Sequence, residues 1–236
     1  MKRPLFLSVI LLAAGCATPL PQNPPAGSPA SIPVPRVSEG DTWTYAARDG
    51  YTGIARGTYR HRVVEASGER IVVEVTKSGA PFGVQQIYTR DWNWIEAPMV
   101  TGRHYRYEPS YAAFAFPLAA GKSWKTEIKA TDPATGQVNR VKIYGKVLGW
   151  ERVKVPAGEF DALVVRRHVY DGAHDYFRSE TSIAEYDWYA PAIASFVKHQ
   201  DSSGYKDKTQ NDPPDYGWVR GDWNVIELVH YRQGGR

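Results

Sequence analysis

Two runs of residues, Tyr59-Arg-His-Arg-Val-Val-Glu65 and Arg70-Ile-Val-Val-Glu-Val-Thr76, decide the fold predicted for this chain. In the second run, Ile71, Val73 and Val75 fall on one side of an extended backbone and the alternate residues fall on the other, which is the period of two of a β-strand. The segment Ser67-Gly68-Glu69 between the runs has the composition of a turn. The sequence therefore predicts a β-hairpin at this place.

The same short, alternating pattern recurs along the chain from Arg36 onward. No stretch of about 12 residues or more has a convincing helical period, and 109–116 is the best place for a helical turn. The many glycines, prolines and aromatic residues also favour strands and turns. We therefore expect an all-β fold, a mostly antiparallel curved sheet that forms a half-barrel or open barrel. Further strands are predicted at 41–48, 84–89, 92–97, 103–107, 122–131, 137–148, 160–170, 175–189, 193–200 and 223–232.

A weak internal repeat accompanies this pattern. Gly40-Asp41-Thr42-Trp43 recurs as Gly121-Lys122-Ser123-Trp124, and each copy is followed by a predicted strand. Each unit later reaches a Trp-rich segment, Asp91-Trp92-Asn93-Trp94 in the first and Asp187-Trp188-Tyr189 in the second. Two copies of one meander would build a continuous sheet. Chance similarity between aromatic strands is the alternative.

The amino terminus has the layout of a signal peptide over residues 1–15. Lys2 and Arg3 precede a short apolar run, and small residues follow it. This run is shorter than the roughly 20 residues that a transmembrane helix needs. The segment Leu12-Ala-Ala-Gly-Cys16 resembles the lipobox of bacterial lipoproteins, in which the cysteine receives a diacylglyceryl group and becomes the first residue of the mature protein. Cys16 is the single cysteine of the chain, which fits a lipid acceptor better than a disulfide partner.

The lipobox resemblance implies a location and a partner. Lipoproteins kept at the inner membrane commonly carry Asp after the cysteine, whereas this chain has Ala17. We therefore expect a protein of the outer membrane, held by lipid on Cys16 with its domain facing the periplasm. Residues 16–35 are rich in proline and are predicted to form an extended tether of about 50 to 60 Å. A ligand for a proline-recognising partner is the alternative, and residues 36–236 are predicted to be a single domain.

The carboxyl-terminal half has a second resemblance. Phe116-Pro117-Leu118, then Val155-Pro-Ala-Gly-Glu-Phe160, then Asp187-Trp-Tyr-Ala-Pro191 resemble motifs of a broad group of uncharacterised bacterial envelope proteins. The resemblance implies a curved antiparallel sheet or half-barrel, and it implies no activity. In physical terms, Pro156 and Gly158 suit the second and fourth positions of a tight turn.

Charge and composition exclude some classes of function. The formal net charge is +4, and it falls by two when Lys2 and Arg3 leave with the signal peptide. Acidic and basic residues are interspersed along the whole chain, so no nucleic-acid partner is expected. His168 and His174 could share a metal ion with Asp171 or Asp175, but isolated surface histidines are the simpler interpretation, and we predict no metal site and no cofactor.

An aromatic segment between the two repeats is the candidate binding site. It could line a lipid-sized cavity in a curved sheet, although plain core filling is the alternative. We expect a binding or scaffolding module for an apolar, lipid-like ligand or for another envelope protein. The candidate ligand-binding residues are Tyr105, Tyr107, Tyr111, Phe114 and Phe116.

The enzymatic alternative depends on three carboxylates. Glu185 and Asp187 are two residues apart on a predicted strand, so they share a face, and Glu180 is close in the chain. Carboxylates beside aromatic residues are what a carbohydrate- or peptidoglycan-acting hydrolase needs. A solvated face paired with arginines is the alternative. Because the chain has no recognised catalytic motif, we predict a protein that is not an enzyme.

Arg56, Arg60 and Arg62 are predicted to share one face of a strand and to form a basic stripe. Such a stripe could bind lipid phosphates or anionic glycans. The alternative is a charged sheet edge that resists aggregation.

Overall fold

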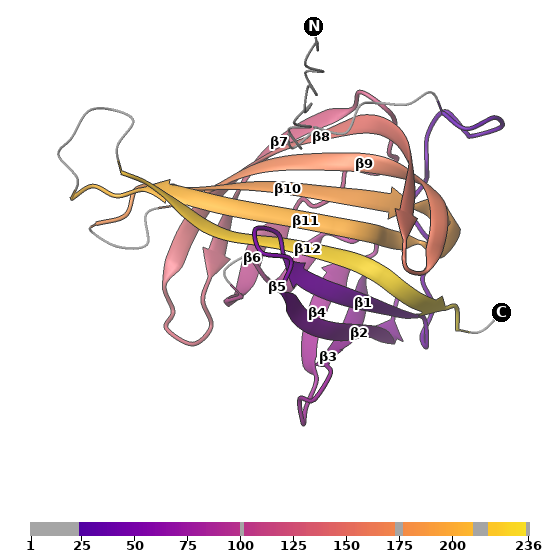
Figure 1. Cartoon of the computed structure of the whole chain (residues 1–236), viewed down its shortest axis with the longest axis horizontal. Helices are drawn as coiled ribbons and strands as arrows, with labels where there is room; N and C mark the ends of the chain where they lie inside the picture. Colours follow the sequence, from indigo (N-terminus) through magenta and orange to yellow (C-terminus); the bar gives the residue numbers. More distant parts are fainter. Residues whose placement is uncertain (1–23, 100–101, 173–176, 210–216, 235–236) are drawn as a thin grey trace, which may run out of the picture.

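The computed structural model describes residues 24–99, 102–172, 177–209 and 217–234. Each strand pairs antiparallel with the next one in the chain, and the last strand pairs with the first, so that the sheet closes into a barrel (Figure 1). Its strands are β1 Thr42–Asp49, β2 Ala55–Ala66, β3 Arg70–Lys77, β4 Val84–Thr89, β5 Trp94–Pro98, β6 His104–Tyr111, β7 Ser123–Thr131, β8 Val138–Val155, β9 Gly158–Asp171, β10 Thr181–Ala190, β11 Ser195–Lys206 and β12 Trp218–Arg232.

The all-β, antiparallel, barrel-like fold predicted from the sequence is confirmed, and the sheet closes fully. The predicted hairpin forms from β2 and β3, with Val63 opposite Val73. Ile71 and Val73 of its second strand are buried in the barrel interior, as the alternation requires. Closure leaves no unpaired edge in the ring of strands, because β1 takes β12 as its second neighbour.

Two local predictions were wrong. The helical turn expected at 109–116 does not form, because β6 continues to Tyr111, which pairs with Trp94 of β5. The strands predicted at 193–200 and 223–232 have different bounds, since β11 continues to Lys206 and β12 already begins at Trp218. The one helical segment in the described residues is the single 3-10 turn Pro191–Ile193. These residues therefore contain no helix that is long enough to span a membrane.

The hairpin turn predicted at residues 155–160 is present at the tip of β8 and β9. Val155 pairs with Gly158 across the two turn residues, and Gly158 has a φ of +133°. This hairpin curls around one end of the barrel (Figure 1). There the Ala157 N–H donates to the Leu228 carbonyl at 3.0 Å. The hairpin tip thus fastens β8 and β9 to β12.

The two Gly-Xaa-Xaa-Trp segments of the predicted repeat make equivalent hydrogen bonds. The N–H of Gly40 donates to the Val63 carbonyl, and the N–H of Gly121 donates to the Val147 carbonyl, both at 2.9 Å. Each glycine has a φ of +85°, which suits a residue without a Cβ. These segments begin β1 and β7, so the barrel divides into two units of six strands.

Matching bulges support this division. The pairing of β2 with β3 shifts after Val63, and the pairing of β8 with β9 shifts after Val147. Likewise, Tyr88 pairs with Trp94 after a shift between β4 and β5, and Tyr189 pairs with Phe196 after a shift between β10 and β11. Trp92 therefore corresponds to a residue in the turn before β11. It does not correspond to Trp188, with which the sequence repeat aligned it.

Side chains fill the barrel interior unevenly. Tyr107, Tyr111, Ile128 and Ile143 are buried along β6, β7 and β8, and they pack that side solidly. The predicted signal peptide, Cys16 and the first part of the predicted tether, up to residue 23, lie outside the described residues. The last part of the tether is attached to the barrel, because Ile32 is buried and exchanges two backbone hydrogen bonds with Leu118.

Gly145 of β8 provides a test of this packing. It lies directly opposite Trp124 of β7, and a Cβ added at Gly145 would lie 2.0 Å from Trp124 Cε2. We expect Gly145→Ala to lower the free energy of unfolding by about 1–3 kcal/mol, measured by urea denaturation. Gly68→Ala is the matched control, because a Cβ there has no atom within 4 Å. Equal stabilities of the two variants would contradict this packing.

Candidate functional site

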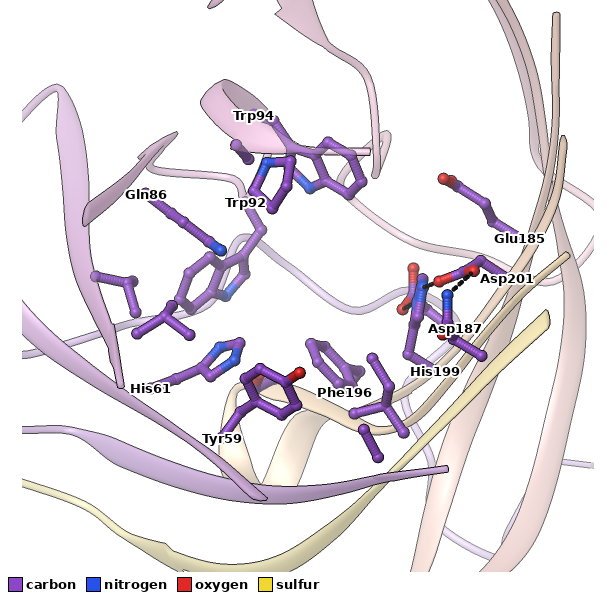
Figure 2. A pocket seen from close by; sticks show the side chains of 18 of the residues that line it. Tyr59, His61, Gln86, Trp92, Trp94, Glu185, Asp187, Phe196, His199 and Asp201 are labelled. Carbon is purple, nitrogen blue, oxygen red and sulfur yellow. Dashed lines mark hydrogen bonds and ion pairs between the residues drawn. The ribbon is translucent and has the colours of Figure 1, made fainter. Parts of the chain in front are cut away.

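The barrel contains a cavity of about 510 Å³. It lies on the side of the interior that the tyrosines of β6 leave open, between β1–β5 and β10–β12 (Figure 2). This volume is in the range of small-molecule binding sites. Its aromatic lining consists of Trp43, Tyr59, His61, Tyr88, Trp92, Trp94, Phe114, Tyr189 and Phe196.

One end of the cavity is closed by two tryptophans. The indole N–H of Trp43 donates to the Ile193 carbonyl at 3.1 Å, and that of Trp92 donates to the Ala194 carbonyl at 2.9 Å. These bonds tie β1 and the β4–β5 turn to the 3-10 turn between β10 and β11. The two indole rings also meet edge to face, with centroids 5.8 Å apart.

The other end of the cavity is open, and we call it the mouth. Arg56 and Asp222 line the cavity there with partly exposed side chains, and Gly102 is exposed beside them. Large apolar side chains are also exposed on the neighbouring hairpin ends. They are Tyr51, Ile54, Phe82, Val84 and Trp218.

A buried ion-pair network forms one wall of the cavity, across the space from His61 and Trp92 (Figure 2). Arg167 of β9 has no exposed surface, and its Nε donates to Glu185 Oε2 at 2.7 Å. The Nη2 atom of Arg167 lies 2.6 Å from Asp187 Oδ2. This contact is an ion pair, but its alignment is not that of a hydrogen bond. Tyr111 donates its hydroxyl to the same Glu185 oxygen at 2.7 Å. Burial, then the charge of Glu185, raises the pKa of Tyr111 well above its ordinary value, so this hydroxyl keeps its proton.

His199 extends the network along β11. Its Nδ1 lies 2.7 Å from Asp187 Oδ1, and its Nε2 lies 3.1 Å from Asp201 Oδ2. Because carboxylates only accept hydrogen bonds, both ring nitrogens must donate, which makes His199 an imidazolium. Burial alone would lower its pKa, but the two carboxylates raise the pKa of His199 to about 10.

Asp187 is ionised for the converse reason. Burial raises its pKa, but the charges of Arg167 and His199 outweigh that effect and lower the pKa to about 2. From Asp201 the network continues to Asn224, whose amide donates at 2.7 Å. Arg56 then donates to Asn224 and pairs with Asp49 and Asp222 at the mouth.

Two bulges turn polar side chains into the cavity. Trp188 pairs with Lys198 and Tyr189 with Phe196, so Val197 is an extra residue, and Phe196 and His199 both face the cavity. Similarly, Ala47 pairs with Gly57 and Arg48 with Ala55, so Arg56 is an extra residue.

The bulge at Arg56 contradicts the predicted basic stripe. Arg56 turns into the mouth, whereas Arg62 points outward and pairs with Glu74 at 3.2 Å. Arg60 is exposed on the same outer face as Arg62.

The five predicted aromatic residues lie together, but only Phe114 lines the cavity. Tyr105, Tyr107 and Tyr111 are buried beside it, with the Tyr107 and Tyr111 rings 5.5 Å apart. Phe116 packs against Tyr189, with centroids 5.4 Å apart. Their role in ligand binding stays a prediction.

The three carboxylates of the enzymatic alternative do not converge. Glu185 and Asp187 face the cavity, but both are paired with Arg167. Glu180 precedes β10, is exposed, and lies 3.8 Å from Lys142. A pKa near 2 also makes Asp187 a poor general acid.

Two of the residues considered for a metal ion, His174 and Asp175, lie outside the described residues. His168 lines a shallow surface hollow with Tyr144 and Tyr170, whereas Asp171 is buried. Within the described ranges, no group of three or more potential ligands could hold a metal ion.

Arg167, His199 and Asp201 were missed by sequence analysis. Each stands alone among strand residues, without a motif or a characteristic spacing. One signal was available. Arg167 is two residues from both Val165 and Val169, which are buried, so alternation along the strand places this arginine on the inner face of β9.

Fold and site together define a closed antiparallel barrel with an aromatic and charged internal cavity. No protein-family model matches the chain, and no curated protein matches it. Among solved structures, the chain is similar to a protein from Bacteroides fragilis described as exported and as having a YmcC-like fold. The identity is 14%, the TM-score is 0.50, and the alignment covers 86% of this chain and 100% of that one.

Two further solved structures are similar at lower scores. A protein from Parabacteroides distasonis described as a lipoprotein has 13% identity and a TM-score of 0.47, with 85% of this chain and 97% of that one covered. The hypothetical lipoprotein YmcC from Escherichia coli has 9% identity and a TM-score of 0.40, with 80% and 84% covered. At such low identity the first of the three similarities supports a shared fold alone.

The protonated His199 makes stability depend on pH. Below its ordinary pKa of 6.5 the ring is charged in both folded and unfolded chains, and between 6.5 and about 10 only the folded protein keeps the proton. We therefore expect the free energy of unfolding to fall by up to about 1.4 kcal/mol per pH unit as pH rises through this window. Urea denaturation at a series of pH values measures it.

His199→Gln should remove this dependence, and His230→Gln is the control, because His230 is exposed on β12. A wild-type protein whose stability is constant from pH 7 to pH 10 would contradict the assignment of His199 as an imidazolium.

Proposed function

We propose that this protein is a lipid-anchored binding module of the bacterial outer membrane, and that its barrel holds an apolar ligand on the periplasmic side. The observation that carries the proposal is the aromatic cavity inside the closed barrel. In a cavity of about 510 Å³ that is open at the mouth, water contacts the rings of tryptophan, tyrosine and phenylalanine. An apolar ligand would displace this water and bury the aromatic surface.

The arrangement of the chain supports an anchored binding module. The amino-terminal segment reaches the barrel at Ile32 and Leu118, beside the segment that begins β7. The strand directions place this contact at the closed end, so the mouth is directed away from the point where the tether joins. Ligand exchange through the mouth would therefore not be blocked by the tether.

The exposed apolar residues at the mouth favour scaffolding as a second role. Phe82 is 83% exposed and Ile54 is 68% exposed, on adjacent hairpin ends. Apolar surface of this kind is typical of contact sites with another protein or with a lipid surface. Such a contact would bring a donor or acceptor of ligand to the mouth, so scaffolding and binding are compatible.

We do not propose a hydrolase. The cavity carboxylates Glu185 and Asp187 are held by Arg167, and Glu180 lies outside the cavity. This arrangement provides no free acid and base on opposite sides of a substrate.

Filling the cavity tests the binding function. Ala47 lines the cavity, and a tryptophan there would occupy part of its volume. We expect the neutral fluorescent probe N-phenyl-1-naphthylamine to bind the wild-type chain, and Ala47→Trp to weaken binding by about tenfold or more, measured by fluorescence titration. The matched control is Ala46→Trp, since the neighbouring residue points to the outside of β1. Equal probe binding by the two variants would exclude the cavity as the site.

The anchor is tested separately. We expect radiolabelled palmitate to be incorporated into the wild-type chain and not into Cys16→Ala, with the wild-type protein in the outer-membrane fraction. Ala17→Asp should keep the label and move the protein toward the inner membrane, as the lipobox resemblance implies. An unlabelled wild-type protein would refute the lipid anchor.

A further inference from the structure

The charges of the buried network do not balance. Arg167 and His199 are the two cations of its buried part, and Glu185, Asp187 and Asp201 are its three carboxylates. All three carboxylates are buried, with Glu185 only 1% exposed. With two cations and three carboxylates, this wall of the cavity carries an excess negative charge. Such an uncompensated charge is costly away from water.

Glu185 has one carboxylate oxygen that the network leaves without a hydrogen bond. Tyr111 and Arg167 both donate to its Oε2 atom. Within the described residues, Oε1 accepts no hydrogen bond, and it is not sealed from the cavity. Figure 2 shows the Glu185 side chain directed into the space that Trp94 also lines. A buried carboxylate oxygen is thus available to a donor that enters the cavity.

The opposite wall suits a cation as well as an apolar group. The rings of Tyr59, Trp92 and Trp94 surround the same space (Figure 2). The faces of such rings attract ammonium groups, most strongly when water is excluded. At the mouth, the Lys77 ammonium already lies 5.6 Å from the centroid of the Tyr59 ring, so one side chain of the protein makes this contact.

The cations at the mouth, Arg56 and Lys77, are not paired with the buried carboxylates of the network. Arg56 is held there by Asp49 and Asp222. His61, which also lines the cavity, stays neutral because burial lowers its pKa to about 4.

We propose that the ligand of this cavity is an organic cation, an amine on an apolar body, whose ammonium group binds Glu185 Oε1 while its apolar part lies against the aromatic wall. This inference rests on the proposed binding function and specifies its ligand class. An anionic head group such as that of a fatty acid would meet the Glu185 carboxylate, because Arg167 and His199 are already paired and the Lys77 ammonium lies at the mouth, so the inner part of the cavity selects against it.

Three probes with one apolar body and different head groups test the inference. They are 4-phenylbutylamine, 4-phenylbutan-1-ol and 4-phenylbutyrate, titrated into the purified full chain at pH 7 with calorimetric detection. We expect the ammonium probe to bind about tenfold or more tightly than the alcohol, and the carboxylate to bind most weakly, because a charge-assisted hydrogen bond is stronger than a neutral one.

The outcomes separate this inference from the proposed function. Equal affinity for the amine and the alcohol, or tightest binding of the carboxylate, overturns the cationic ligand class and leaves an apolar binding module. Failure of all three probes and of N-phenyl-1-naphthylamine to bind overturns both proposals.

A pair of variants locates the recognition. Glu185→Gln keeps an oxygen near Tyr111 but removes the negative charge, so the preference for the amine over the alcohol should fall about tenfold. Glu180→Gln is the matched control, because Glu180 is exposed and pairs with Lys142 outside the cavity. Circular dichroism establishes whether Glu185→Gln folds, and the comparison of the three probes on the wild-type chain is decisive without it.

Discussion

The buried guanidinium of Arg167 is the group on which the rest of the interior depends. Arginine does not give up its proton in a protein, so a fully buried Arg167 must be paired. Its partners are Glu185, Asp187 and the Ala113 carbonyl, which accepts at 2.9 Å. These contacts join β9, β10 and the segment after β6. Because Glu185 lies directly opposite Arg167, a slip of one residue between the strands would turn one partner outward and leave the other charge buried alone.

The same network explains how a cavity persists inside the barrel. The Asp187 and Asp201 carboxylates are held by His199, so they cannot swing across the interior. The aromatic wall is equally fixed, since Trp94 stacks on Tyr111 with centroids 4.2 Å apart. Collapse of the two walls onto each other would place apolar rings against charged groups that had lost their partners. The paired charges of one wall and the packed rings of the other therefore oppose collapse of the cavity.

The strands and their antiparallel order could be predicted from the sequence because both follow from local patterns. The period of two at Ile71, Val73 and Val75 and the turn at Pro156 each depend on a few neighbouring residues. Closure could not be predicted, because it depends on Thr42 meeting Arg232 at the far end of the chain. A single sequence contains no local signal for that contact.

The cavity residues were less predictable for a different reason. Strict alternation predicts that Phe196 and His199 face opposite sides, and that Arg56 shares a face with Arg60. One bulge at Val197 and another at Arg56 reverse both predictions. Bulges are set by the pairing of two strands, so the composition of one strand does not reveal them. The tyrosines of the predicted aromatic segment fill the interior beside the cavity, so they limit the space that the cavity can occupy.

The two walls of the cavity are formed by equivalent strand positions in the two six-strand units. Val75 pairs with Val84 in the first unit, at the position where Arg167 pairs with Glu185 in the second. In the same way, Val73 pairs with Gln86, and Val165 pairs with Asp187. Matching turns and bulges bring these positions to matching depths in the barrel, so apolar and uncharged side chains of one unit face charged side chains of the other. A cavity with one aromatic and one charged wall thus follows from placing different side chains on two copies of the same strand arrangement.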